Sequence, residues 1–301
     1  IGKKVTKKDQ PNLFNLIEEG SKKIKSIFPD NVILGSEASF YVTSSDIYLV
    51  SEGSTEILNG KTLYIPLVFL KILTKDELAG IIGHELAHFS GEDLEYAEQF
   101  NSTLFSLKEK FISFDKSFEE ARKDLGEGFY GAVALSITKL FLVILLNPIS
   151  YIFINLIKKD SKIGINQEIR ADKIGSRLCK NKKSFITGLC KFSIFSQVYF
   201  SIYNDFINDL KNQNNKSLST RFGVDYKNYL INSNVKNDLK KIMAYQMAHP
   251  SDTHPPIKDR MKNLKIDIKD ISKNDLIKTK PSAAELINNY EDIDKLLLLN
   301  G

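Results

Sequence analysis

The sequence predicts an α+β fold that is mainly helical, with a small β-sheet beside a helix that carries two histidines. Apolar residues recur at helical spacing in residues 11–28 and again in residues 78–89. Between residues 40 and 65 the chain instead has short stretches rich in β-branched and aromatic residues, which are typical of strands. With 301 residues, of which 42% are hydrophobic, the chain can bury one large core or two modest ones.

The sheet is expected to come from four short strands early in the chain. They lie at residues 40–43, 47–50, 56–58 and 61–65. Asn59-Gly60 stands between the last two, and this dipeptide is preferred in type I′ turns, where both central residues have positive φ. The pattern therefore predicts a β-hairpin around Asn59-Gly60.

The helix that carries the histidines has its own start signal. Thr74 and Glu77 fit a capping box, in which each side chain accepts a hydrogen bond from the backbone N–H of the other residue. Gly80 and Gly83 are poor helix formers, so their presence within this helix indicates that another element packs closely against it.

The pentapeptide His84-Glu85-Leu86-Ala87-His88 lies within this helix and indicates a zinc site. Residues four apart share one face of a helix, so the two imidazoles can bind one ion. Glu85 can then act as general base on a water molecule at that ion. The chain has only four histidines, which makes a chance match rare. The alternative is an exposed helix with two incidental histidines.

A catalytic zinc site needs a third protein ligand and keeps one position open. Glu168 is the candidate, because Glu168 and Asp172 are again four residues apart and project from one helical face. Asp172 could accept a hydrogen bond from the far nitrogen of a ligand histidine and so determine its tautomer. Such pairs of acidic residues are also common on solvated helices, so this pattern alone leaves both interpretations open.

Three motifs in this order resemble those of a known family. The pentapeptide His84-Glu85-Leu86-Ala87-His88 is followed by Glu168-Ile169-Arg170-Ala171-Asp172, and then by Thr253-His254-Pro255-Pro256 with Arg260 four residues later. From about residue 40 to residue 260, the chain resembles the metallopeptidase family of the HtpX heat-shock protease and the CAAX prenyl endopeptidase.

The resemblance implies a zincin-like fold of the gluzincin type, with the small β-sheet beside the helix of the first motif. It implies one zinc ion per chain and proteolysis of proteins or peptides, often at a membrane. The sheet edge could pair with an extended peptide substrate. The implied zinc ligands are His84, His88 and Glu168, and the implied catalytic base is Glu85.

The resemblance also makes His254 and Arg260 candidates. His254 would donate a hydrogen bond to the oxyanion of the tetrahedral intermediate, or swing onto the zinc ion and block the water position. The alternative is a loop histidine that orders the neighbouring prolines. Arg260 would be an oxyanion partner or a residue of a salt bridge. We therefore expect Glu85 and His254 to act in catalysis, and Asp172 and Arg260 to support them.

An apolar run at 131–157 bears on how the chain meets a membrane. One helical crossing needs roughly 20 apolar residues. His84 precedes the run and Glu168 follows it, so if both bind one ion the chain must cross an even number of times. The run is too short for two crossings. We therefore expect membrane surface contact through an interfacial or re-entrant hairpin, and the alternative is a buried helix pair in a soluble domain.

The whole chain, 1–301, is predicted to be a single zinc metallopeptidase catalytic domain. A helical, partly apolar insertion at about 96–160 would separate the helix of the two histidines from the helix of Glu168. The chain begins with Ile1, which indicates a fragment or a processed form.

Charge and cysteine content argue against other classes of protein. The 42 basic and 37 acidic residues give a net charge of +5, and no basic patch with interleaved aromatic residues suggests nucleic acid as a partner. Cys179 and Cys190 have no metal-ligand spacing and predict buried or free thiols rather than a disulfide framework. Nothing in the pattern predicts an oligomeric state.

These observations predict a zinc-dependent endopeptidase that hydrolyses peptide bonds in proteins. We expect a membrane-associated quality-control or processing protease with its catalytic domain in the cytoplasm. Its partners would be a protein or peptide substrate and a membrane surface at 131–157. Two alternatives stay open: a CAAX-type protease of prenylated proteins, and a zinc-binding chaperone or scaffold with little proteolysis. Glu85 argues against the second, because binding alone needs no general base.

Overall fold

The computed structural model of the chain describes residues 2–51, 54–89, 162–195, 223–228 and 255–299, residue 231, and six single residues between 102 and 120. The chain divides into two compact units, one of Ile1–Leu94, Asn166–Ala248 and His254–Gly301, the other of Glu95–Ile165 and His249–Thr253. Almost all described residues belong to the first unit, and the site lies in it. The insertion predicted at 96–160 falls largely outside the described residues, so the single catalytic domain stays a prediction.

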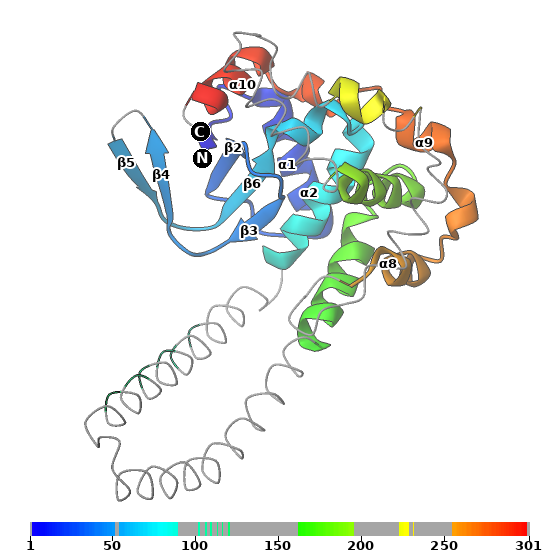
Figure 1. Ribbon diagram of the computed structural model, residues 1–301, viewed down its shortest axis with the longest axis horizontal. Coiled ribbons are helices and arrows are strands. Elements are labelled where there is room, and N and C mark those ends of the chain that lie inside the picture. The colour runs from blue at the N-terminus through cyan, green and yellow to red at the C-terminus, as the bar shows by residue number, and fades with distance from the viewer. Residues whose placement is uncertain are drawn as a thin grey trace, which may run out of the picture. The chain divides into compact units, whose positions relative to one another are not determined.

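A four-stranded mixed sheet forms the centre of the first unit (Figure 1). Its strands stand in the order β1 (Gly2–Val5), β2 (Asn31–Gly35), β6 (Thr62–Pro66) and β3 (Tyr41–Thr43). The central strands β2 and β6 are parallel and fully buried, whereas β1 and β3 run antiparallel to their neighbours and form the edges. The sequence pattern predicts β3 and β6 but misses β1 and β2.

A two-stranded ribbon, β4 (Ile47–Ser51) paired with β5 (Ser54–Leu58), covers one face of this sheet. Leu49 and Leu58 of the ribbon are buried in a small cluster with Ile33 and Tyr64 of the sheet. Side chains alternate between the two faces of a strand, so the neighbours of Ile33 and Tyr64 point to the opposite face and join the main core.

The hairpin predicted around Asn59-Gly60 is wrong, because β5 pairs with β4 while β6 pairs with β2 and β3. Gly60 has a φ of 91°, but Asn59 is not among the residues with positive φ, as a type I′ turn requires. Asp30 instead accepts a hydrogen bond from the backbone N–H of Lys61 (2.8 Å), and the Asn59 amide donates to Asp46 (2.8 Å). These bonds hold a loop that returns the chain from the ribbon to the sheet.

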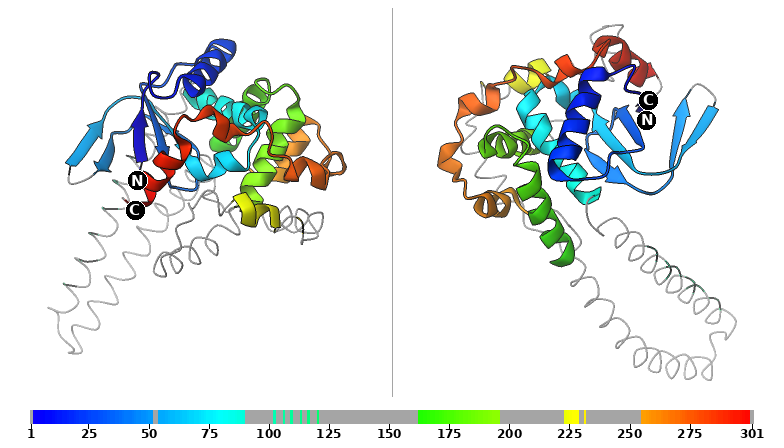
Figure 2. Two further views of the ribbon diagram at one scale, coloured as in Figure 1. Left: turned by 90° about the horizontal axis from the view of Figure 1, so that it is seen from above. Right: turned by 180° about the vertical axis from the view of Figure 1, so that it is seen from behind.

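Two helices, α1 (Pro11–Ile24) and α2 (Lys75–Phe89), cover the other face of the sheet (Figure 2). The 3-10 turn η1 (Leu67–Lys71) joins β6 to α2. Pro11 stands in the first turn of α1. The helix ends at Ile24, four residues before the predicted end, and Lys25 caps it in the left-handed conformation. Apolar residues of these helices and of the sheet form the main core, which includes Leu13, Ile17, Leu34, Leu63, Leu78, Ile82 and Leu86.

Helices at 162–175 and 182–195, and a short one at 223–228, follow in the described part of the chain. The C-terminal segment contains α8 (Ile257–Leu264), η2 (Ile268–Asp270), α9 (Lys273–Ile277), η3 (Ala283–Leu286) and α10 (Tyr290–Leu299). This segment contacts the N-terminal part of the chain. The Gln10 side-chain amide donates a hydrogen bond to the carbonyl of Asn288 (3.1 Å), and Tyr290 Oη donates one to the carbonyl of Leu67 (2.7 Å).

No helix among the described residues is long and apolar enough to cross a bilayer. The predicted membrane contact depends on a different segment of the chain. The apolar run at 131–157, on which that prediction depends, lies outside the described residues.

The close packing predicted at Gly80 and Gly83 is confirmed. A Cβ added at Gly83 would lie 2.5 Å from Leu178 and 3.1 Å from Cα of Gly175, and one at Gly80 would lie 2.4 Å from Sγ of Cys179. Gly175, at the end of helix 162–175, is the reciprocal contact: its added Cβ would lie 2.6 Å from the Gly80 carbonyl oxygen. The two helices therefore touch backbone to backbone.

Gly175→Ala should lower the free energy of unfolding by about 1–3 kcal/mol, the usual cost of overpacking a close contact. The new methyl group would meet backbone atoms of α2, including the His84 nitrogen at 2.7 Å, and these cannot move without the whole helix. Gly223→Ala is the matched control, because its Cβ meets Lys71 at an ordinary 3.6 Å. Denaturant unfolding of both variants checks this, and equal stabilities would contradict it.

Candidate metal centre

The capping box predicted at the start of α2 is confirmed. Glu77 accepts a hydrogen bond from the backbone N–H of Thr74 (2.7 Å), and Thr74 Oγ1 accepts one from that of Glu77 (3.2 Å). The fully buried Lys191 forms an ion pair with the same carboxylate at 2.7 Å, and Thr187 donates to it at 2.8 Å. Burial lowers the pKa of Lys191, and the charge of Glu77 counteracts part of that effect. The start of α2 is thus tied to helix 182–195.

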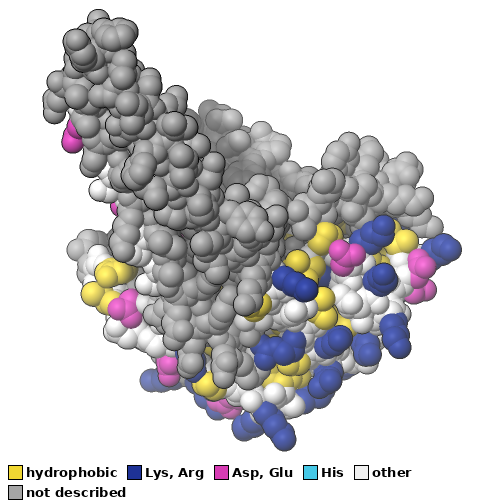
Figure 3. Space-filling model, turned by 90° about the horizontal axis from the view of Figure 1, so that it is seen from below, with side chains coloured by type: hydrophobic (Ala, Val, Ile, Leu, Met, Phe, Trp, Pro, Cys, Tyr) yellow, Lys and Arg dark blue, Asp and Glu magenta, His cyan; other side chains and the backbone are white. Residues whose placement is uncertain are grey.

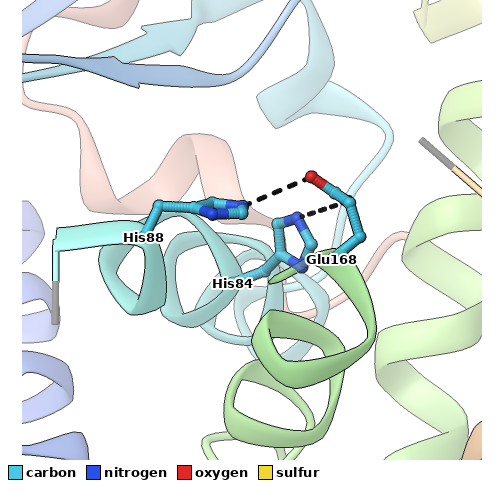
Figure 4. A group of neighbouring side chains, drawn as sticks. All are labelled: His84, His88 and Glu168. Carbon is cyan, nitrogen blue, oxygen red and sulfur yellow. Dashed lines mark ion pairs between the residues drawn. The ribbon is translucent and has the colours of Figure 1, made fainter. Parts of the chain in front are cut away.

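His84 and His88 project from one face of α2 and meet Glu168 from helix 162–175 (Figure 4). Nε2 of His84 lies 3.3 Å from one carboxylate oxygen of Glu168, and Nε2 of His88 lies 3.4 Å from the other. The two imidazole rings are 5.0 Å apart between centroids and nearly perpendicular, at 84°. Glu168 and His84 are 5% and 4% exposed, so these groups meet in a largely water-excluded position.

The donor set fits a zinc ion. One ligand atom of each of the three residues lies within 4.8 Å of the others, and the atoms are two imidazole nitrogens and a carboxylate oxygen. Zinc bonds of about 2.0–2.1 Å at tetrahedral angles place neighbouring ligand atoms about 3.3 Å apart. Each imidazole Nε2 lies at about that spacing, 3.3 or 3.4 Å, from a different oxygen of the Glu168 carboxylate. Two histidines and one glutamate leave a fourth position for water, as in catalytic zinc sites.

Asp172 and Arg260 lie behind His84. Nδ1 of His84 is 3.0 Å from the Asp172 carboxylate, which is fully buried. Arg260 of α8 donates to both oxygens of Asp172, from Nε at 2.8 Å and from its terminal Nη2. Of the two roles considered for Arg260, the structure therefore contains the salt bridge. Its partner is on another helix, 88 residues earlier in the chain.

Electrostatics stabilise this arrangement. Burial alone would lower the pKa of His84, but its hydrogen bonds with Asp172 and Glu168 outweigh burial and raise it. Burial would raise the pKa of Asp172, yet hydrogen bonds from His84 and Arg260 lower it. Burial also opposes the charge on Arg260, and Asp172 raises its pKa in return. Asp172 is thus a carboxylate that can hold Nδ1 of His84 and leave Nε2 directed at Glu168.

Of the two residues predicted to act in catalysis, the structure describes Glu85 but not His254. Glu85 lies between the two histidines on α2 and is partly exposed, as a residue that must reach a substrate needs to be. His254 lies outside the described residues, so its role stays a prediction.

Phe185 also lies at the site and was not predicted from the sequence. Its ring is 6.0 Å from that of His84 and 5.9 Å from the Arg260 guanidinium carbon. No sequence signal distinguishes it from other buried phenylalanines.

The predictions for the cysteines hold. Cys190 is buried and Cys179 partly buried, and both are free thiols. Burial raises the pKa of each to about 12, so neither is a reactive thiolate at neutral pH.

Comparison with known proteins gives one match. The model of peptidase family M48 matches residues 55–267, which is more than half of the chain and includes the three candidate ligands, Asp172 and Arg260. No curated protein and no solved structure matches the chain. The matched length, together with an assembled metal-ligand group inside it, shows that the chain belongs to peptidase family M48, the metallopeptidases that include HtpX and the CAAX prenyl endopeptidase.

Proposed function

We propose that the chain is a zinc-dependent endopeptidase that hydrolyses peptide bonds in proteins. The observation that carries the proposal is the convergence of His84, His88 and Glu168, whose ligand atoms lie within 4.8 Å of one another. Membership of family M48 supports the hydrolytic chemistry and a protein or peptide as substrate. Among the described residues this is the only group of its kind, which supports one zinc ion per chain.

The proposed reaction assigns separate tasks to the ligands and to Glu85. His84 and His88 bind through imidazole nitrogens and Glu168 through its carboxylate. A zinc ion held there would polarise the scissile carbonyl and lower the pKa of the water molecule bound to it towards about 7. Glu85 accepts a proton from the attacking water and later delivers it to the leaving amine.

Three further residues are proposed to prepare the site for this reaction. Asp172 accepts a hydrogen bond from Nδ1 of His84 and so favours the tautomer with a free Nε2. Arg260 holds Asp172 with two donors, which keeps the carboxylate charged and oriented. His254 is proposed to donate a hydrogen bond to the oxyanion.

The substrate is proposed to bind as an extended strand along β3. This strand is the edge of the sheet that lies beside α2, and it pairs with β6 on its other side. A peptide that adds to such an edge gains backbone hydrogen bonds regardless of its sequence. Substrate binding of this kind suits an endopeptidase that cleaves within long or unfolded chains.

A casein digestion assay tests the proposal together with a metal analysis of the purified protein. We expect one zinc ion per chain, cleavage inside the casein chain, loss of cleavage with a chelator, and recovery when zinc is added back. Full activity in the chelator after zinc has been shown to be absent would contradict the proposal.

Membrane association is proposed on sequence grounds, from the apolar run at 131–157. Lys and Arg side chains, which anionic lipid surfaces attract, also gather on the described part of one face of the molecule (Figure 3). A quality-control or processing role at a membrane is consistent with both observations.

Ile144→Ser combined with Leu145→Ser should reduce binding to lipid vesicles by at least about tenfold while cleavage of a soluble peptide persists. Burial of one such side chain in the lipid contributes about 1.5–3 kcal/mol to the binding free energy, so loss of two should lower vesicle binding at least tenfold. A flotation assay measures the binding, and a thermal melt reports on the fold. Unchanged flotation with a collapsed melting temperature would show that the run packs in a protein core instead.

A further inference from the structure

A groove of about 690 Å³ opens at the N-terminal end of α2. Its walls come from the first turn of α2, from the turn at 178–181 with the start of helix 182–195, and from residues 275–281. The rise of about 1.5 Å per residue puts Lys75 about 13 Å from His84 along the helix axis. The groove is therefore separate from the metal-ligand group and serves none of the roles proposed for it.

Lysines outnumber acidic residues in the lining of the groove. Five lysines from its three walls contribute, against three acidic residues. The lysines are Lys75, Lys180, Lys183, Lys278 and Lys280. Leu16, Ala79, Leu178 and Pro281 add apolar side chains, and the uncharged polar residues of the lining are Thr74, Asn181, Ser184 and Thr187. The groove thus combines an excess of positive charge with a partly apolar surface.

Each acidic residue of the lining already has a hydrogen-bond or ion-pair partner. Glu77 is neutralised from the protein interior by Lys191, at 2.7 Å. Asp76 accepts a hydrogen bond from the backbone N–H of Lys180 at 2.8 Å, and Asp275 pairs with Lys183 at 2.7 Å. Burial would raise the pKa of Asp275, but hydrogen bonds from Lys183 and Ser272 lower it to about 2. Glu77 and Asp275 are therefore already paired with other lysines, and Asp76 forms no ion pair in the part of the chain that the structure describes.

Three lysines are left without an ion pair in the part of the chain that the structure describes. Lys75 binds Glu285 at 2.9 Å, whereas Lys180, Lys278 and Lys280 are exposed and have no carboxylate within ion-pair distance there. Like charges around one groove repel one another, and an anion in the groove would relieve that repulsion. The ammonium group of lysine is a compact point charge with three donors, which suits phosphate oxygens.

We propose that this groove binds a phosphate group, with Lys180, Lys278 and Lys280 as its ligands. A phosphate monoester carries about −1.5 to −2 charges at neutral pH and three acceptor oxygens, which three lysines can satisfy together. A single carboxylate would leave most of this charge uncompensated. The apolar part of the lining accommodates the organic remainder of a phosphate ester. The proposal is independent of the peptidase chemistry, because no residue of the metal centre takes part.

The test is calorimetric titration of the zinc-loaded protein with inorganic phosphate at low ionic strength, where screening is weak. The groove variant carries Lys180→Ala, Lys278→Ala and Lys280→Ala. The matched control carries Lys8→Ala, Lys227→Ala and Lys269→Ala, three exposed lysines outside the groove, so both variants lose the same net charge. We expect affinity to fall at least tenfold in the groove variant and less than twofold in the control.

Vesicles with and without phosphatidic acid distinguish a lipid from a free phosphate compound as the source of the group. If the groove variant loses phosphate binding and also binding to phosphatidic acid vesicles, the ligand is a lipid headgroup. If it loses only the former, the ligand is a soluble phosphate. Equal phosphate affinity in the groove variant and the control would overturn the proposal, because binding would then reflect net charge or the zinc ion, which both variants share.

Discussion

Glu85→Gln is expected to reduce peptide hydrolysis by about 10²–10⁴-fold while zinc stays bound at one ion per chain. Gln has nearly the same size as Glu and cannot accept a proton at neutral pH, so the substitution removes the general base alone. The three candidate ligands are other residues, so metal content should not change. The measurements are casein or peptide cleavage rates and metal analysis of the same preparation.

Glu56→Gln is the matched control for that variant. Glu56 is an exposed residue of β5 in a solvent-exposed ion pair with Lys4 at 3.6 Å, and its substitution should leave cleavage and zinc unchanged. Loss of zinc in Glu85→Gln would mean that the ligand set is misassigned. Retained zinc with undiminished cleavage would place the base elsewhere. Wild-type protein that binds zinc and cleaves nothing would instead favour the scaffold alternative.

Features that depend on nearby residues were predicted well from the sequence. The capping box of Thr74 and Glu77 and the close contact at Gly83 follow from rules that operate within one helix or its packing face. The spacing of His84 and His88 on α2 is of the same kind, since residues four apart must share a face of a helix.

Features that depend on distant parts of the chain were missed or left open. β2 pairs in parallel with β6, about thirty residues later, and its continuous burial gives no alternating pattern. The hairpin around Asn59-Gly60 failed for a related reason, because Asp30 from another loop determines that turn. Lys191 would be taken for a surface residue from sequence, and only the fold shows that it is buried against Glu77.

The candidate site falls between these two cases. Glu168 and Asp172 were chosen by spacing, but their proximity to His84 requires a second helix to cross α2 at Gly80 and Gly83. Arg260 was open between two roles until its partner was known, because α8 brings it to a carboxylate 88 residues earlier in the chain. A motif thus identifies the residues, and the tertiary structure decides which of them touch.

Glu168→Ala is expected to abolish stoichiometric zinc binding, because two histidines alone do not form the three-ligand site of a zinc enzyme. The protein without metal should stay folded, since the substitution removes a buried carboxylate rather than stranding a charge. Asp172→Ala should weaken zinc binding by only about 10–100-fold, as expected for a residue that orients a ligand. Competition with a chromogenic chelator measures the zinc affinity of each variant. Denaturant unfolding of the metal-free proteins measures their stability. Zinc that survives in Glu168→Ala would make another carboxylate the third ligand.

Stability separates the two substitutions further, because Asp172 is also the partner of a buried arginine. Asp172→Ala leaves the Arg260 guanidinium buried without its carboxylate, so the metal-free protein should lose about 3–5 kcal/mol of unfolding free energy. Asp172→Leu with Arg260→Met replaces both members of the pair by apolar side chains and should recover most of that loss. The double variant should nevertheless keep the weakened zinc affinity, since Nδ1 of His84 still lacks its acceptor. Recovery of zinc affinity together with stability would show that Asp172 acts on the fold and not on His84.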